Sequence, residues 1–144
     1  MPCLARAVAL TAVLSPFLAA GVAEADPSPD CAVLRQAAGD YSKLASHFST
    51  LRKVAEQPGQ HAEAKRELAD QARAMGDTLR DLSGKLADQD LKNLYWNDAL
   101  SFDDYADAIV NSVNSGDVSD VKDAYRRNVK AVNAANDAFH ATCK

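Results

Sequence analysis

The residues best suited to bind a metal ion or haem are few, and the helices predicted below hold them far apart. The chain contains three histidines, His47, His61 and His140. At about 1.5 Å of rise per residue, a bundle of the predicted helices is about 40 Å long, with His140 near one end and His61 near the other. His47 lies about 13 Å from the His61 end of its helix. Asp137 and His140 form a carboxylate–histidine pair at helical spacing, but a di-iron bundle needs two such pairs and two more carboxylates. We therefore predict no metal site and no cofactor.

The end of the chain offers an alternative, a bundle that carries haem. Ala138-Phe139-His140 resembles the closing helix of secreted b-type cytochrome bundles, in which a histidine near the chain end ligates haem. The resemblance implies His140 as an axial ligand. It covers one short stretch, and the first predicted helix, near Leu34, has no methionine or histidine as the opposite ligand. The C-x-x-C-H pattern of covalent haem attachment is also absent from the sequence.

Two cysteines, Cys31 and Cys143, lie at the two ends of the helical region. We expect them to form a disulfide, since an exported protein meets an oxidising compartment. The sequence has no G-x-S-x-G, no H-E-x-x-H and no glycine-rich phosphate loop, the patterns that would indicate an enzyme. A small secreted helical enzyme is therefore the second alternative, behind a non-enzymatic function.

One level of the predicted bundle combines aromatic rings with an amide. Counting rise along each helix places His47, Tyr105, Tyr125 and Asn128 at about the same height. Asn128 occupies a position on the buried face, where an amide without partners costs about 1–3 kcal/mol. These residues either satisfy one another and fix the helix register, or they line a small pocket for an apolar ligand.

The third predicted helix has two surface features. Trp96 either packs under the end of the bundle or anchors a protein partner, because aromatic residues dominate interface hot spots. Four carboxylates after the first turn of the helix make it acidic, and for these we predict a solvated face rather than a cation-binding surface. They are Asp98, Asp103, Asp104 and Asp107.

The elements that carry these residues follow from apolar positions that recur at alternating steps of three and four, the pattern of a helix that buries one face. We predict a first helix from Pro29, capped by Ser28, to about Glu56, a second from Gln60 to Ala87, a third from the N-cap Asp88 to Val113, and a fourth from Asp117 or Ser119 to Cys143. Gln57-Pro58-Gly59 and Asn114-Ser115-Gly116 separate helices. Ser101 and Asp104 have the spacing of a capping box, but the unbroken apolar phase favours one continuous third helix.

Four helices of similar length with short links alternate in direction. We therefore predict an all-α, antiparallel, up-down-up-down four-helix bundle, in which the start of the first helix lies beside the end of the last. This topology brings Cys31 and Cys143 together. Since many positions on the buried faces are alanine, we also expect close packing and little internal space.

The first residues of the chain predict export. Arg6 precedes an apolar run from Ala7 to Ala20, and Ala23-Glu24-Ala25 fits an A-x-A cleavage site, so residues 1–25 are predicted to be a signal peptide. Residues 26–144 are then one secreted or periplasmic domain with no transmembrane segment. A net charge of −4 with intermixed signs argues against nucleic acid binding, which needs a basic face. The predicted function is non-enzymatic, either structural or the binding of a protein partner or a small apolar ligand.

Overall fold

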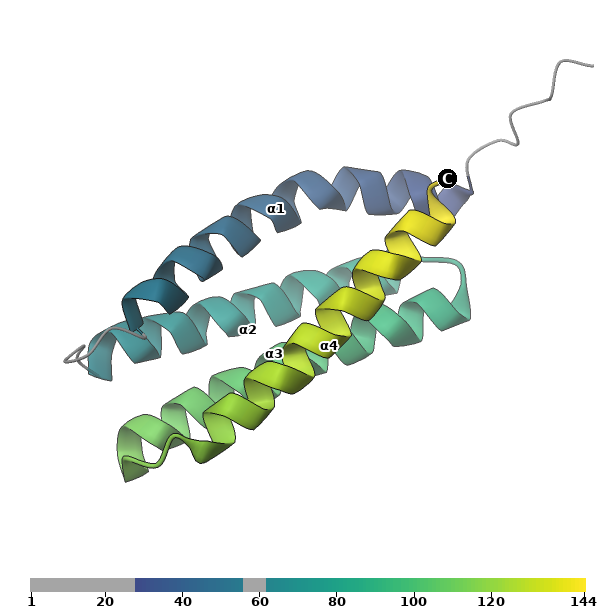
Figure 1. Cartoon of the computed structure of the whole chain (residues 1–144). Coiled ribbons are helices and arrows are strands. Elements are labelled where there is room, and N and C mark those ends of the chain that lie inside the picture. Colours follow the sequence, from purple (N-terminus) through teal and green to yellow (C-terminus); the bar gives the residue numbers. More distant parts are fainter. Residues whose placement is uncertain (1–27, 56–61) are drawn as a thin grey trace, which may run out of the picture.

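The computed structural model describes residues 28–55 and 62–144 (Figure 1). These residues form four helices, α1 (Pro29–Ala55), α2 (Ala62–Lys85), α3 (Gln89–Ser115) and α4 (Ser119–Thr142). The predicted signal peptide, the Gln57-Pro58-Gly59 stop and the predicted start of the second helix at Gln60 lie outside the described residues. None of the helices in the described ranges combines the length and apolar character that a bilayer-spanning segment requires.

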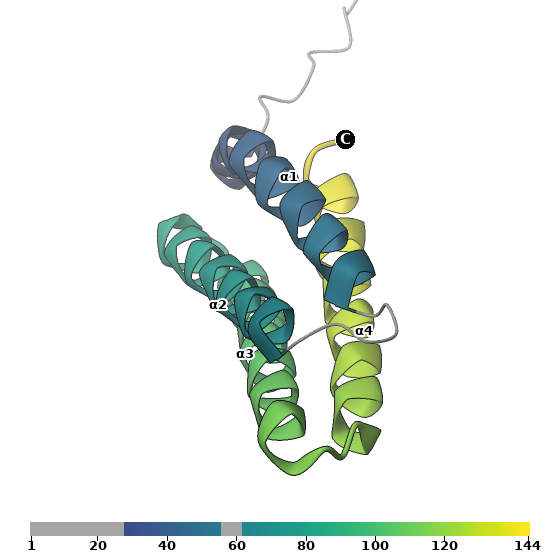
Figure 2. The same cartoon turned by 90° about the vertical axis from the view of Figure 1, so that its left-hand side faces the viewer.

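The four helices form the predicted antiparallel, up-down-up-down bundle. Each helix packs against its neighbour in sequence; α2 and α3 share the most extensive contact, and α1 and α4 the least extensive. Figures 1 and 2 both show the end of α4 beside the start of α1. The Cys31–Cys143 disulfide joins these two ends, with a Cα–Cα distance of 5.1 Å. The predicted fold and the predicted disulfide are confirmed.

Side-chain caps start α1 and α3 where the sequence predicts them. The Ser28 Oγ accepts a hydrogen bond from the Cys31 N–H at 3.1 Å. The Asp88 carboxylate accepts one from the Leu91 N–H at 2.9 Å. Each cap satisfies a backbone donor that the first turn of a helix leaves without an intrahelical partner.

The link between α3 and α4 differs in one detail from the prediction. Gly116 ends α3 in the left-handed conformation, with φ 77°, and its N–H donates to the Ser112 carbonyl. The N-cap of α4 is Val118, not Asp117 or Ser119, and no side chain caps it. Asp117 instead accepts from the Ser119 N–H at 2.8 Å, in a turn that precedes the first residue of α4.

The third helix continues through Ser101 without a break. The Ser101 Oγ donates to the Asp98 carbonyl at 2.7 Å, so the hydroxyl bonds backward along its own helix instead of capping a new one. The favoured prediction of one long helix is therefore confirmed.

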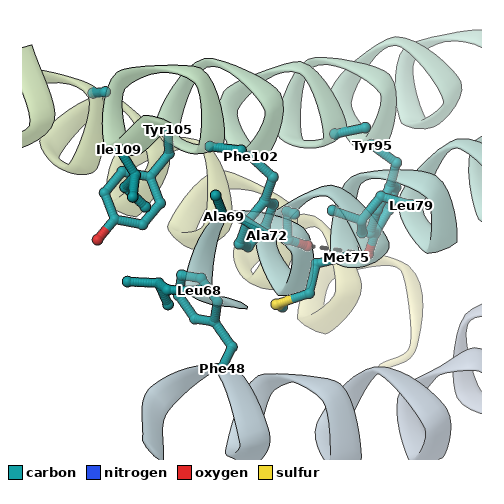
Figure 3. Packing of buried hydrophobic residues seen from close by; sticks show 14 of the residues in the cluster. Phe48, Leu68, Ala69, Ala72, Met75, Leu79, Tyr95, Phe102, Tyr105 and Ile109 are labelled. Carbon is teal, nitrogen blue, oxygen red and sulfur yellow. Dashed lines mark hydrogen bonds between the residues drawn. The ribbon is translucent and has the colours of Figure 1, made fainter. Parts of the chain in front are cut away.

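An aromatic cluster fills one half of the bundle. Phe48 of α1 meets Phe102 and Tyr105 of α3 edge to face, at centroid distances of 5.6 and 6.0 Å (Figure 3). The ring centroids of Tyr105 and of Tyr125 of α4 are also close, at 5.7 Å. These contacts join three helices, and the Arg52 guanidinium covers the outer side of Tyr125 at 4.8 Å from its centroid.

The start of α1 is held to the turn between α2 and α3. Asp30 is buried, and its two carboxylate oxygens accept hydrogen bonds from the Ala87 N–H at 2.6 Å and the Asp88 N–H at 2.8 Å. The carboxylate of α1 thereby provides the acceptor for two backbone N–H groups of the turn. The turn and the disulfide therefore fix the same end of α1.

Candidate ligand-binding site

An apolar groove of about 240 Å³ lies in the half of the bundle that contains the disulfide. All four helices contribute to its lining, which consists of Leu34, Ala37, Ala38, Tyr41, Leu79, Leu82, Tyr95, Asp98, Val132, Asn133, Ala135, Asn136 and Phe139. The expectation of little internal space is wrong here. Because α1 packs on α2 and barely reaches α4, small side chains such as Ala37 and Ala135 do not fill the space between them.

The groove has a buried floor and an open mouth. Leu34 of α1 and Leu79 of α2 are almost fully buried. The lining residues Ala38 of α1 and Asn133 and Asn136 of α4 are exposed. The mouth of the groove therefore lies between α1 and α4, with two amides on its α4 side.

Asp98 places a carboxyl group in this largely apolar lining. The residue is only 1 % exposed. Among the described residues its carboxyl group has one donor, the Ser101 hydroxyl, at a long distance of 3.5 Å. That hydroxyl has a single hydrogen, which the Asp98 carbonyl takes at 2.7 Å. The carboxyl group is therefore buried at the groove without a well-formed hydrogen bond from the protein.

Burial controls the ionisation of Asp98 and of the two tyrosines in the lining. Desolvation raises the pKa of Asp98 to about 7, against a small opposing effect of the Ser101 hydroxyl. Desolvation, followed by the negative charge of Asp98, raises the pKa of Tyr95 to about 12. The same two causes, with a contribution from Tyr95, raise the pKa of Tyr41 above its ordinary value. Both tyrosines keep their protons at neutral pH, and the Tyr95 hydroxyl donates to the Ala135 carbonyl at 3.2 Å.

The four residues predicted to share a level are only partly brought together. Tyr105 and Tyr125 are in ring contact. Asn128 is buried, and its side-chain amide donates to the Ser101 hydroxyl at 2.9 Å rather than to a tyrosine. His47 is exposed on α1. None of the four lines the apolar groove, so the structure assigns Asn128 to a link between α4 and α3.

The sequence predicted a solvated face for the four carboxylates of α3, but not all of them lie on one. Asp103 and Asp107 form ion pairs with Arg80 and Arg73 of α2, the second at 3.0 Å. Asp104 is exposed. Asp98 alone is buried, and the prediction is wrong for this residue.

Trp96 lies at the surface of α3. Its side chain is 46 % exposed, and that of Leu100, one helical turn later, is 43 % exposed. The Arg80 guanidinium lies over the indole ring, 5.8 Å from its centroid. This arrangement leaves an apolar pair open to solvent, as a partner surface would require.

His47 and His140 are both exposed, and His61 lies outside the described residues. His140 meets Phe139 edge to face, and none of the described histidine, methionine or cysteine side chains lines the groove. The described residues contain no group of three or more histidine, cysteine, aspartate or glutamate side chains that could hold a metal ion. The axial ligands that the resemblance to b-type cytochromes implies therefore do not fit the groove.

The spacing of Asp98 in the sequence indicates a buried position, although its charge favours solvent. Asp98 follows Tyr95 by three residues and precedes Phe102 by four, so it shares their buried face. Ser101 stands in the same relation to Tyr105 and is likewise buried. A polar residue at apolar spacing was the sequence signal for the site.

The fold and the site together define a helical bundle with a buried carboxyl group in an apolar groove. The chain matches no known protein family, no curated protein and no solved structure.

Proposed function

We propose that this protein is an exported, non-enzymatic helical bundle that binds a small, largely apolar ligand in the groove between α1 and α4. The observation that carries the proposal is the groove itself, an apolar space of about 240 Å³ with one buried carboxyl group. A cavity of about 150 Å³ inside a protein is large enough for benzene, so this groove has room for a somewhat larger molecule.

The composition of the lining also supports binding. Ligand sites are mostly apolar and carry a few polar groups that orient the ligand. Here leucine, alanine, valine and phenylalanine side chains supply the apolar surface. Asp98 at the floor and Asn133 and Asn136 at the mouth supply polar groups at two depths.

Export is supported by the first residues of the chain and by the disulfide. The apolar run from Ala7 to Ala20 and the A-x-A sequence ending at Ala25 are typical of a cleavable signal peptide. A disulfide across 112 residues suits an oxidising compartment. A secreted or periplasmic location is therefore part of the proposal.

Binding explains the site better than catalysis does. A carboxyl group whose pKa is about 7 is suited to general acid–base chemistry. Such chemistry also needs a nucleophile or a group that stabilises developing charge. The part of the lining that the structure describes has no lysine, arginine, histidine, cysteine or serine, and the Tyr95 hydroxyl is already bonded to a backbone carbonyl.

The test is an NMR titration of the disulfide-bonded protein with n-octanol, a neutral amphiphile. We expect saturable shifts of backbone amides confined to the groove, centred on Leu34, Tyr41 and Asp98. Ala38→Trp places a large ring at the mouth from an exposed helical position and should abolish these shifts. Ala74→Trp, at an exposed alanine of α2 outside the groove, is the matched control and should bind as the wild type does.

Two results would contradict the proposal. One is the absence of saturable binding, and the other is binding that Ala38→Trp leaves unchanged. The search for a function would then move to the exposed Trp96–Leu100 pair and to a protein partner, the alternative that the sequence raised.

A further inference from the structure

We infer that the ligand of this groove carries a protonated amine, which pairs with the Asp98 carboxylate while its hydrocarbon part lies among the apolar side chains. This inference rests on the proposed function, since it names the chemical class of the ligand for the same groove. It follows from hydrogen bonding, charge and the aromatic rings of the lining.

The first argument is the missing donor. Asp98 is 1 % exposed, and its carboxyl group faces a space that the protein does not fill. Within the described residues, the one hydrogen bond to it comes from the Ser101 hydroxyl, at 3.5 Å, and the hydrogen of that hydroxyl is used by the backbone. Buried carboxylates are normally paired or hydrogen-bonded. An ammonium group brings the donors and the positive charge that the protein itself does not provide.

The second argument is the charge of the lining. From α1 only Tyr41 is titratable, and from α3 only Tyr95 and Asp98. The lining residues from α2 are both leucine, and those from α4 are apolar or amide side chains. Among the described residues, the lining of the groove therefore presents one carboxylic acid and no basic side chain. A cation complements this lining, whereas a carboxylate or phosphate ligand would meet an uncompensated negative charge.

The third argument is the pair of tyrosines in the lining. Tyr41, Tyr95 and Asp98 all line the same groove, and the negative charge of Asp98 contributes to the raised pKa of both tyrosine hydroxyls. Aromatic faces attract ammonium groups, and most strongly in a desolvated site. Both hydroxyls are protonated at neutral pH, so neither adds a negative charge of its own.

Binding of the amine is coupled to the proton of Asp98. Below about pH 7, where the carboxyl group of the free protein is mostly protonated, it releases its proton to solvent and the carboxylate then pairs with the ammonium group. At about pH 8 the carboxyl group is already mostly ionised, so the amine binds without this release. Since the pKa of Asp98 is about 7 in the free protein, amine affinity should rise about tenfold between about pH 6 and about pH 8. An alkylamine keeps its own proton throughout this range.

The experiment compares three probes with the same hydrocarbon chain, n-octylamine, n-octanol and octanoate, by NMR titration at the two pH values. We expect n-octylamine to bind most tightly at about pH 8 and to show the tenfold rise, and n-octanol to show no rise. Octanoate should bind most weakly. This comparison uses the wild-type protein and does not depend on any variant folding.

Two variants test the carboxyl group itself. Asp98→Asn keeps the shape of the side chain and removes its ionisation, so amine affinity should fall at least tenfold at about pH 8 and lose its pH dependence. Asp104→Asn, at an exposed carboxylate of the same helix, is the control and should behave as the wild type does.

The outcomes separate this inference from the proposed function. If n-octanol and n-octylamine bind equally with the same pH profile, or if octanoate binds best, the groove binds ligands and the amine inference is overturned. If Asp98→Asn retains the full pH dependence, the inference is also overturned. If no probe binds in the groove, the proposed function fails and the inference fails with it.

Discussion

At the scale of single residues, Asp98 is in an environment that favours its protonated form. Its carboxyl group is buried and receives no well-formed hydrogen bond within the described residues, so desolvation raises its pKa from 3.8 to about 7. The unfolded chain exposes the same group to water, where it ionises at its ordinary pKa. The ligand-free protein should therefore lose stability as the pH rises through the interval between these two values.

Asp98→Asn tests this loss of stability. Between about pH 4 and about pH 7 the native protein keeps a proton that the unfolded chain releases, so the free energy of unfolding falls with rising pH. The asparagine variant cannot ionise and lacks this contribution. We expect its stability relative to the wild type to increase by about 3 kcal/mol between about pH 4.5 and about pH 8.

Urea denaturation of both proteins at a series of pH values measures this difference, because ionisations common to the two proteins cancel. Asp104→Asn, at an exposed position, serves as the control and should track the wild type. A pH-independent difference between Asp98→Asn and the wild type would mean that Asp98 ionises in the native protein as readily as in the unfolded chain.

Asp98 also shows the limit of sequence reasoning at this scale. Its spacing from Tyr95 and Phe102 places it on the buried face, whereas its charge suggests solvent. Sequence alone does not decide between the two, because burial of an acid depends on space that only the packed helices define. Asn128 was correctly placed on a buried face, but its partner Ser101 belongs to another helix and follows only from the structure.

At the scale of elements, the attachment of α1 depends strongly on Asp30. Its carboxylate bonds two backbone N–H groups of the α2–α3 turn, at 2.6 and 2.8 Å. The turn that Asp30 meets lies more than fifty residues away in the chain, so the sequence did not predict this contact. The side-chain caps of α1 and α3 are local and were predictable, whereas this contact is not local.

Asp30→Ala should destabilise the protein by about 2–3 kcal/mol, because it removes a charged acceptor that bonds two backbone N–H groups of the turn. The midpoint of guanidinium denaturation measures this loss, provided that its slope is unchanged. Asp40→Ala is the matched control on the same helix. Asp40 forms only an exposed ion pair with Lys43, so its loss should cost less than about 0.5 kcal/mol.

Equal effects of the two substitutions would contradict the assigned role of Asp30. A smaller cost for Asp30→Ala than for Asp40→Ala would do so as well. In either case the α2–α3 turn would not be a point of attachment for α1.

At the scale of the whole molecule, the groove exists because α1 and α4 are joined at one end and packed little along their length. Their mutual contact is the least extensive of the neighbouring pairs, and the disulfide ties the start of one to the end of the other. The topology was predictable from helix lengths and cysteine positions. The separation of α1 from α4 was not, because it depends on how fully small side chains fill the space between helices.

Reduction of the Cys31–Cys143 disulfide should therefore loosen α1 before the other helices. The bridge closes a loop across 112 residues, and its loss should lower the free energy of unfolding by about 4–5 kcal/mol in the chain-entropy description.

Hydrogen exchange of the reduced and oxidised protein, read by mass spectrometry, should show the largest loss of protection in α1. The loss should be smallest where α2 and α3 pack most extensively. Reduction should also weaken n-octanol binding, because α1 and α4 form the two sides of the mouth. An equal loss of protection in all four helices would instead mean that the bundle opens as one cooperative unit, and that α1 is held as firmly by packing as the other helices are.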